Sequence, residues 1–116
     1  MLFRSEASTY NKENDKTEEI IYLPEGKIKK RKAIKYNSSN DKSEEGHYDG
    51  SGNLIDREIY TYNAEGERIS EVTLDKDNNV IKKVLIIYDK KGMPVEKRIY
   101  DAKNNLESTL KIAIEY

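Results

Sequence analysis

The sequence predicts an all-β protein: an antiparallel β-meander of about nine strands, built from 26-residue repeats of two strands each. Three observations predict it. Tyrosine recurs at a fixed interval, a glycine or asparagine follows each of these positions four places later, and the intervening segments have the length of strands. We interpret residues 1–116 as a single β-repeat domain of about four and a half repeats, with the option that it is part of a longer array. The sheet is expected to be an open twisted sheet or a β-spiral.

The repeat is defined by two interleaved series of anchor positions. The first series is Tyr10, Tyr36, Tyr62 and Tyr88, whose position numbers rise in steps of 26. The second series has the same period and lies between these positions, so that the merged anchors alternate in spacings of 12 and 14. Its members are Tyr22, Tyr48, Leu74 and Tyr100.

Each anchor is followed by the residues of a tight turn. Directly after the anchor stands Asp or Asn, except at Leu23, and four places after it stands Gly or Asn, the residue types that tolerate positive φ. This pattern is typical of a type I turn closed by one left-handed residue, the common three-residue hairpin loop. The predicted structural turn residues are Gly26, Gly52, Gly66, Asn78, Gly92 and Asn104, with Asn14 and Asn40 at the equivalent places.

The segments between the turns are predicted to be strands. A helix is excluded because the turn signals recur too often to leave room for one. The expected strands are 2–10, 17–23, 28–36, 42–49, 54–62, 68–75, 80–88, 94–101 and 106–115.

The turn positions also predict the register, because consecutive strands joined by tight turns are antiparallel neighbours. Each anchor is then opposite the residue six positions later. With unbroken alternation along every strand, all anchors fall on one face of the sheet. The other face is then expected to carry an apolar stripe among charges, concentrated in the C-terminal half: Ile55, Ile59, Ile69, Ile81, Leu85, Ile87, Val95 and Ile99.

Four of the turn segments carry a further pattern. Tyr48–Leu54 reads YDGSGNL, and weaker versions begin at Tyr62, Tyr88 and Tyr100. This pattern resembles the YD repeat of the Rhs and wall-associated-protein family, roughly Tyr-Asp-x-x-Gly-Asn/Arg-Leu. The resemblance implies antiparallel strands in a long sheet or β-spiral and an extracytoplasmic or cell-surface location; no signal peptide is visible in Met1–Tyr10. MORN-type repeats are a second candidate, against which the absence of Trp and the few glycines count.

Composition excludes several classes of function. The chain has no Cys and one His, which argues against a transition-metal site and a His-based catalytic triad, and no cofactor is expected. The net charge is −1, and the sequence contains no apolar run long enough for a transmembrane helix. Gly50-Ser51-Gly52 is a hairpin tip and not a phosphate-binding loop. We therefore predict a protein that is not an enzyme.

Three further features resemble parts of functional sites. Asp75–Asn79 alternates oxygen-bearing side chains as a calcium loop does, but lacks the bidentate glutamate downstream, so we interpret it as a repeat turn. The carboxylate pairs Asp56/Glu58 and Glu44/Glu45 are interpreted as solvated surface, and His47 as a cross-strand surface residue.

The segment Lys27–Lys35 is the one strongly basic stretch of the chain. Alternation places Lys29, Arg31 and Lys35 on one face of a strand and Lys30 and Lys32 on the other. Because this divides the charge, we predict no nucleic-acid binding. We expect the stretch to form ion pairs with acidic residues of the neighbouring strands: Glu18, Glu19, Glu44 and Glu45.

The predicted function is that of a non-enzymatic structural or interaction module, part of a larger bacterial extracytoplasmic assembly. The expected partner is protein, bound by self-association through edge strands, above all the last one, or through adjoining repeats; membrane insertion is not expected. The alternative is a glycan- or peptide-binding module that uses an open edge or a tyrosine-rich face; a cytosolic immunity-type repeat protein is a third possibility. The tyrosines of that possible ligand surface are Tyr36, Tyr48, Tyr60, Tyr62, Tyr88 and Tyr100.

Overall fold

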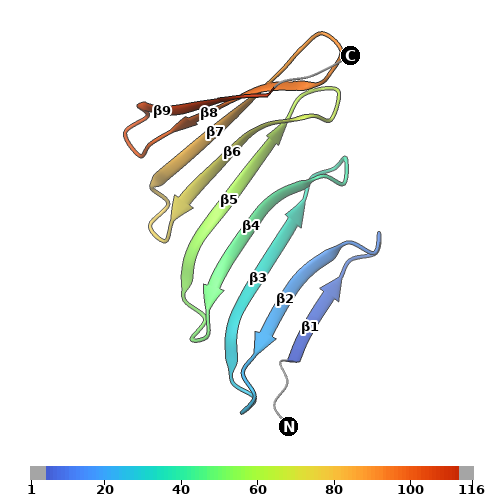
Figure 1. The fold of residues 1–116 in the computed structure, drawn as a ribbon. Coiled ribbons are helices and arrows are strands. Elements are labelled where there is room, and N and C mark those ends of the chain that lie inside the picture. The colour runs from blue at the N-terminus through green and yellow to red at the C-terminus, as the bar shows by residue number, and fades with distance from the viewer. Residues whose placement is uncertain (1–4, 113–116) are drawn as a thin grey trace. The chain divides into compact units, whose positions relative to one another are not determined.

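The computed structural model describes residues 5–112 and is all-β. Its nine strands form one antiparallel sheet in which the order in space is the order in the chain (Figure 1). The predicted fold class is therefore confirmed. The strands are β1 (Ser5–Tyr10), β2 (Lys16–Tyr22), β3 (Ile28–Tyr36), β4 (Lys42–Asp49), β5 (Leu54–Tyr62), β6 (Arg68–Asp75), β7 (Val80–Tyr88), β8 (Pro94–Tyr100) and β9 (Leu106–Lys111).

The strand limits follow the predicted ones closely. The strands from β3 to β7 have the predicted bounds, β2 is shifted by one position towards the N-terminus, and β8 ends one position earlier than predicted. β9 ends at Lys111, so Ile112, which the prediction included, is not part of a strand. The outer parts of the first and last predicted strands, 2–4 and 113–115, lie outside the described residues. This agreement arises because the position of each turn is determined by its own residues. The strands are then the segments between consecutive turns.

The turns have the predicted backbone geometry. In each of them the N–H of the Gly or Asn four places after the anchor donates to the carbonyl of the first turn residue, for example Gly52 N to Asp49 O at 3.1 Å. At all eight of these positions φ is positive: Asn14 67°, Gly26 91°, Asn40 65°, Gly52 86°, Gly66 81°, Asn78 67°, Gly92 80° and Asn104 65°.

The Asp or Asn that begins a turn stabilises it with its side chain. In the turn that follows β4, Asp49 Oδ1 accepts the N–H groups of Ser51 and Asn53, both at 2.9 Å. The same pair of bonds occurs in every turn that begins with Asp or Asn. Leu23 has no acceptor in its side chain, so the turn after β2 depends on its backbone bonds and on Gly26.

The prediction that all anchors share one face is wrong. Each hairpin with a described register has one extra residue just after its turn, for instance Val95 between the pairs Tyr88↔Pro94 and Ile87↔Glu96. A bulge of this kind reverses the alternation. Within the described registers of each unit, successive anchors therefore take opposite faces, as Tyr36 and Tyr48 do in the first unit and Tyr88 and Tyr100 in the second. The extra residues are Thr17, Lys29, Ser43, Ile81, Val95 and Glu107.

The predicted apolar stripe is corrected for the same reason. Ile99 is opposite Val84, on the face that carries Tyr88, whereas Leu85 and Ile87 are on the face that carries Tyr100. Ile81 and Val95 are the extra residues of their hairpins. In each unit we name one face the tyrosine face: in the first unit the face of β1–β4 that carries Tyr10 and Tyr36, and in the second unit the face of β6–β8 that carries Tyr88.

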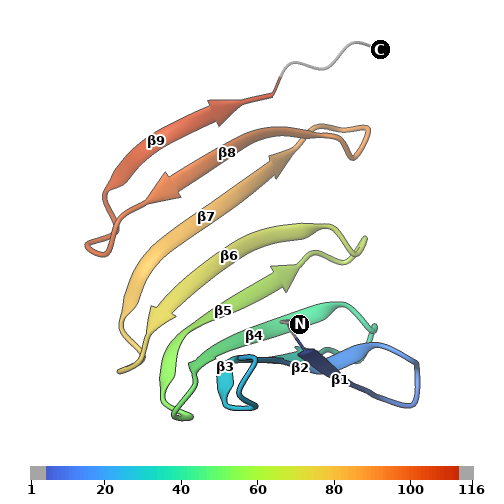
Figure 2. The ribbon, with the colours of Figure 1, turned by 60° about the horizontal axis from the view of Figure 1, so that its bottom comes forward.

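The chain divides into two compact units, Met1–Arg57 and Glu58–Tyr116, with β5 spanning the boundary. Within the second unit, no other described element lies over either face of β6–β9 (Figure 2). Burial is accordingly shallow. The most buried apolar side chains among residues 5–112 are Ile21, Tyr60 and Val84, which are 7%, 6% and 8% exposed.

Candidate functional site

On the tyrosine face of each unit there are ion pairs whose positions in the sequence follow the period of the repeat. Lys16 Nζ is 3.1 Å from Glu19 Oε2, and one repeat later Lys42 Nζ is 3.1 Å from Glu45 Oε1. In the second unit Arg68 Nη1 is 3.0 Å from Glu71 Oε2. Residues three apart on a regular strand point to opposite faces. The extra residue after the turn, such as Thr17, brings the two partners onto one face.

A tyrosine hydrogen bond also recurs with this period. The Tyr36 hydroxyl donates to the carbonyl of Lys16 at 2.8 Å, and in the second unit the Tyr88 hydroxyl donates to the carbonyl of Arg68 at 2.6 Å. The two bonds span the same separation in the sequence. Tyr36 and Tyr88 thus each reach from their own strand to the preceding strand of the sheet. The tyrosine stabilises the contact between successive hairpins.

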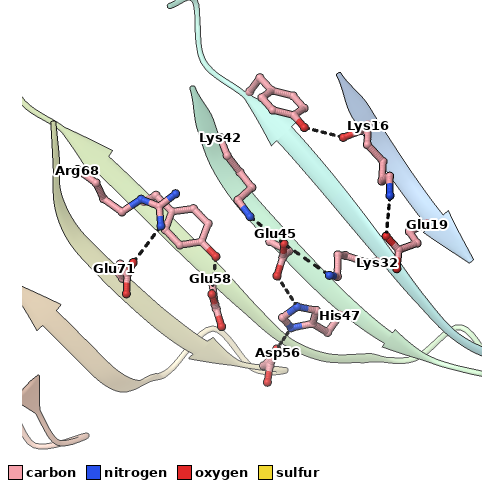
Figure 3. Close-up of polar contacts among 12 residues, drawn as sticks. Lys16, Glu19, Lys32, Lys42, Glu45, His47, Asp56, Glu58, Arg68 and Glu71 are labelled. Carbon is pink, nitrogen blue, oxygen red and sulfur yellow. Dashed lines mark hydrogen bonds and ion pairs between the residues drawn. The ribbon is translucent and has the colours of Figure 1, made fainter. Parts of the chain in front are cut away.

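In the first unit, His47 lies between two carboxylates at the end of β4 (Figure 3). Its Nδ1 is 2.5 Å from Asp56 Oδ1 on β5, and its Nε2 is 2.8 Å from Glu45 Oε2. Glu45 also pairs with Lys42, and its other oxygen is 3.9 Å from Lys32 Nζ. The Glu45 side chain is 12% exposed and that of His47 is 30% exposed. The cluster joins three strands, β3, β4 and β5, through charged side chains.

The cluster changes the pKa values of its members. Burial is the largest influence on His47 and lowers its pKa, but the hydrogen bonds to Asp56 and Glu45 outweigh it, and the pKa is raised above the ordinary 6.5. Burial is also the largest influence on Glu45 and raises its pKa, but bonds to His47 and Lys42 outweigh this, and the pKa is below the ordinary 4.5. The two carboxylates therefore stabilise the imidazolium form of His47 more than solvent does.

The cluster predicts a defined pH dependence of stability. Because the folded pKa of His47 is raised, its contribution is complete below 6.5 and is lost as the pH rises through the folded value. We expect urea unfolding at about pH 5.5 and about pH 8.5 to show a larger loss of stability on alkalinisation in the wild type than in His47→Gln. His47 is the only histidine of the chain. Equal losses in the two proteins would contradict a stabilising imidazolium.

A shallow depression of about 320 Å³ lies beside the cluster. Ile21, Lys30 and Lys32 line it from β2 and β3, and His47 and Asp56 from β4 and β5. Both ring nitrogens of His47 are already bonded to carboxylates, so the ring has no free nitrogen with which to ligate a metal or activate a nucleophile. Among residues 5–112 no group of His, Asp and Glu side chains has the arrangement of a metal site. The geometry indicates electrostatic cross-linking of strands.

The basic stretch forms ion pairs across strands, as predicted, with one exception. Arg31 is 3.0 Å from Glu18 and Lys35 is 3.5 Å from Glu44, both on the face opposite the tyrosine face, while Lys32 approaches Glu45 on the tyrosine face. Glu19 pairs with Lys16 instead. Lys29 is the extra residue of its hairpin.

The tyrosines predicted as a ligand surface are divided between the two faces and are engaged within the sheet. The ring of Tyr48 lies 4.3 Å beneath the Arg31 guanidinium. Tyr60 is buried, and the Tyr62 hydroxyl accepts from Arg68 Nη2 at 3.2 Å. The hydroxyls of Tyr36 and Tyr88 donate to the backbone, and Tyr100 is half-buried on β8. A ligand role for these residues stays a prediction.

The predicted assignment of Asp75–Asn79 as a repeat turn agrees with its hydrogen bonds. Asp75 Oδ1 accepts the N–H groups of Asp77 and Asn79. These backbone bonds, above all the one from Asn79, lower the pKa of Asp75. Asp75 therefore has the same role as Asp49 in its own turn.

Sequence reasoning missed the periodic ion pairs and the cluster around His47. The signal for the ion pairs is present in the sequence, since Lys16, Lys42 and Arg68 are 26 apart and each is followed by Glu three places later. The His47 cluster has no such repeat. It requires knowing that Asp56 of β5 lies beside His47 of β4, which the turn spacing does not show.

Comparisons with known proteins identify a similar fold and no family. No protein-family model and no curated protein matches the sequence. The crystal structure of a protein of unknown function from Bacteroides fragilis matches with a TM-score of 0.69 and 15% identity, over 96% of this chain and 93% of that one. A GtfA/B complex bound to UDP and GlcNAc matches with a TM-score of 0.36 and 14% identity, over 94% of this chain and 24% of that one. The first likeness shows the fold alone. Within residues 5–112, no helix has the length and apolarity needed to cross a membrane.

Proposed function

We propose that this protein is a non-enzymatic structural repeat module, whose sheet is lengthened by further strands of its own kind or of a partner protein. The observation that carries the proposal is the recurrence of one inter-hairpin contact. The hydrogen bonds from Tyr36 to the Lys16 carbonyl and from Tyr88 to the Arg68 carbonyl join equivalent positions in both units. Such nearest-neighbour contacts are how repeat arrays gain stability as they grow.

The charged side chains support a structural role. Each periodic pair neutralises two charges within one strand, and the cluster at His47 bridges β3, β4 and β5. The resemblance of Tyr48–Leu54 to YD repeats supports membership of a larger bacterial assembly outside the cytoplasm. In that setting the module would form one section of a longer sheet.

An added repeat tests the proposal. A second copy of residues 80–105, inserted after Asn105, supplies one more β7 and β8 in the correct phase before β9. We expect a single cooperative transition in urea, with a higher midpoint and a larger denaturant slope, because the slope follows the surface exposed on unfolding. The control carries the same inserted segment in scrambled order, which removes the turn spacing.

The result that would contradict the proposal is also specific. If the native-order insert lowers the midpoint as much as the scrambled insert does, the hairpins are not interchangeable, and the repeat-module function is wrong. If it adds a separate low-stability transition, the inserted hairpin does not join the sheet. Either outcome is independent of whether the chain binds a second molecule.

A second candidate function is a peptide-binding module that adds a strand at an open edge. One observation favours it: every described side chain of β9 is exposed, including two leucines. Strand addition to an exposed edge is a common mode of peptide recognition. The same edge also suits a second copy of the chain.

A further inference from the structure

The outer edge of β9 is open and apolar in the described part of the chain. β9 is the last strand of the sheet and has a neighbour, β8, on one side only. Leu106 and Leu110 are 54% and 57% exposed, the highest values among the large apolar residues that are described. In β1, at the other edge, the side chains from Glu6 to Thr9 are small or charged. An exposed apolar edge is the usual place for pairing with another chain.

The direction of the backbone groups on β9 is fixed by one hydrogen bond. The Ile112 N–H donates to the Val95 carbonyl on the β8 side at 2.9 Å. Backbone groups alternate in direction along a strand, so those of Leu110 also point to β8, and those of Thr109 and Lys111 point away from it. The outer edge therefore offers the N–H and C=O of Thr109 and Lys111.

We propose that β9 of a second copy of this chain occupies this edge, in antiparallel pairing across a two-fold axis at Leu110. The inference rests on the proposed function and names its partner. In this register Thr109 of each copy exchanges two hydrogen bonds with Lys111 of the other. Leu110 is opposite its own counterpart at a non-hydrogen-bonded site, where side chains approach most closely. The most exposed leucine of the described chain is thereby buried.

The charges on β9 fit this register. Lys111 is opposite Thr109 of the second copy, and its diagonal neighbours are Lys111 and, at the extra residue of the hairpin, Glu107 of that copy, both within reach of a long side chain. No like charges are directly opposite. Among the described residues neither Glu107 nor Lys111 forms an ion pair within its own chain. Both remain available to the second copy.

The test is sedimentation equilibrium of the full chain over a concentration series up to about 1 mM, which reveals even a weak dimer. We expect the wild type to approach twice the mass of a single chain. Thr109→Pro removes an outward N–H and is tolerated at an edge, so it should remain folded and be monomeric. Thr109→Ala, the matched control, should dimerise as the wild type does. Leu110→Lys should weaken dimerisation at least tenfold, because it places two ammonium groups opposite each other.

A charge exchange tests the register itself. Glu107→Lys and Lys111→Glu should each weaken the dimer several-fold, because each brings like charges together, and the double variant should restore wild-type affinity. The circular dichroism spectrum of each variant reports whether it is folded.

The outcomes separate this inference from the proposed function. A wild type that stays monomeric, or a dimer unaffected by Thr109→Pro and Leu110→Lys, overturns the pairing through β9. Loss of the dimer in Thr109→Pro with no effect of either charge reversal overturns the register centred on Leu110. The repeat-module function is decided separately by the inserted repeat.

Discussion

Replacing Tyr60 by alanine is expected to lower the free energy of unfolding by about 3 kcal/mol, the lower end of the range for a buried aromatic side chain. Tyr60 is the most buried apolar residue among residues 5–112, with 6% of its surface exposed. Its ring lies 4.1 Å from the Arg68 guanidinium carbon, and its hydroxyl donates to Glu58. No second layer of described elements covers the sheet in this unit, so few other side chains can fill the space. Urea unfolding measures the effect.

Two further variants test whether the loss of stability in Tyr60→Ala comes from burial of the ring. Tyr60→Phe keeps the ring and removes the bond to Glu58, and we expect a cost of about 1 kcal/mol. Tyr10→Ala removes a tyrosine that is 53% exposed, and we expect a cost of less than about 1 kcal/mol. If Tyr60→Ala and Tyr10→Ala have equal effects, Tyr60 is not part of a core.

Gly50→Ala is expected to destabilise the first unit by about 2–3 kcal/mol, the upper part of the range for overpacked sites. Gly50 is in the turn after β4, and a Cβ atom placed there would be 2.2 Å from the carbonyl oxygen of Ile28, at the start of β3. The obstacle is backbone, so it cannot move aside as a side chain can. The reason for glycine here is close approach, because Gly50 is not among the residues with positive φ.

The control for Gly50 is the equivalent turn position after β6, which is Lys76. Lys76 already has a Cβ atom, so Lys76→Ala should change stability by less than about 0.5 kcal/mol. Thermal or urea unfolding of both variants provides the comparison. A Gly50→Ala protein as stable as the wild type would show that the two hairpins do not approach as closely as the structure has them.

The sequence predicts the fold well because the determining interactions are local. Each turn requires a left-handed residue and a side-chain acceptor three positions before it, and both are visible as Gly52 and Asp49 or as Asn78 and Asp75. Each pair of turns then leaves a strand of known length. Leu23 shows the limit of the rule, because the backbone and Gly26 maintain the turn without an acceptor.

The faces of the sheet could not be predicted in this way. Their assignment depends on one extra residue per hairpin, and the residues in that place share no chemical type, as Thr17, Lys29 and Ile81 illustrate. In the sequence alone, the anchor spacings of 12 and 14 are both even numbers, and they therefore indicate that side chains alternate between the two faces without interruption. The contact between His47 and Asp56 joins β4 to β5 and has no counterpart in the repeat pattern, which is why the sequence pattern favours a surface role for His47.

The bulge also constrains how such a chain can lengthen over evolutionary time. Duplicating a single strand with its turn would add one reversal of face, and every downstream side chain would then point to the wrong side. Duplicating two strands restores the original orientation. Insertions and deletions of strands that are retained in evolution should therefore comprise whole 26-residue repeats. The period of the tyrosines is then the shortest insertion or deletion that keeps every side chain on its original face.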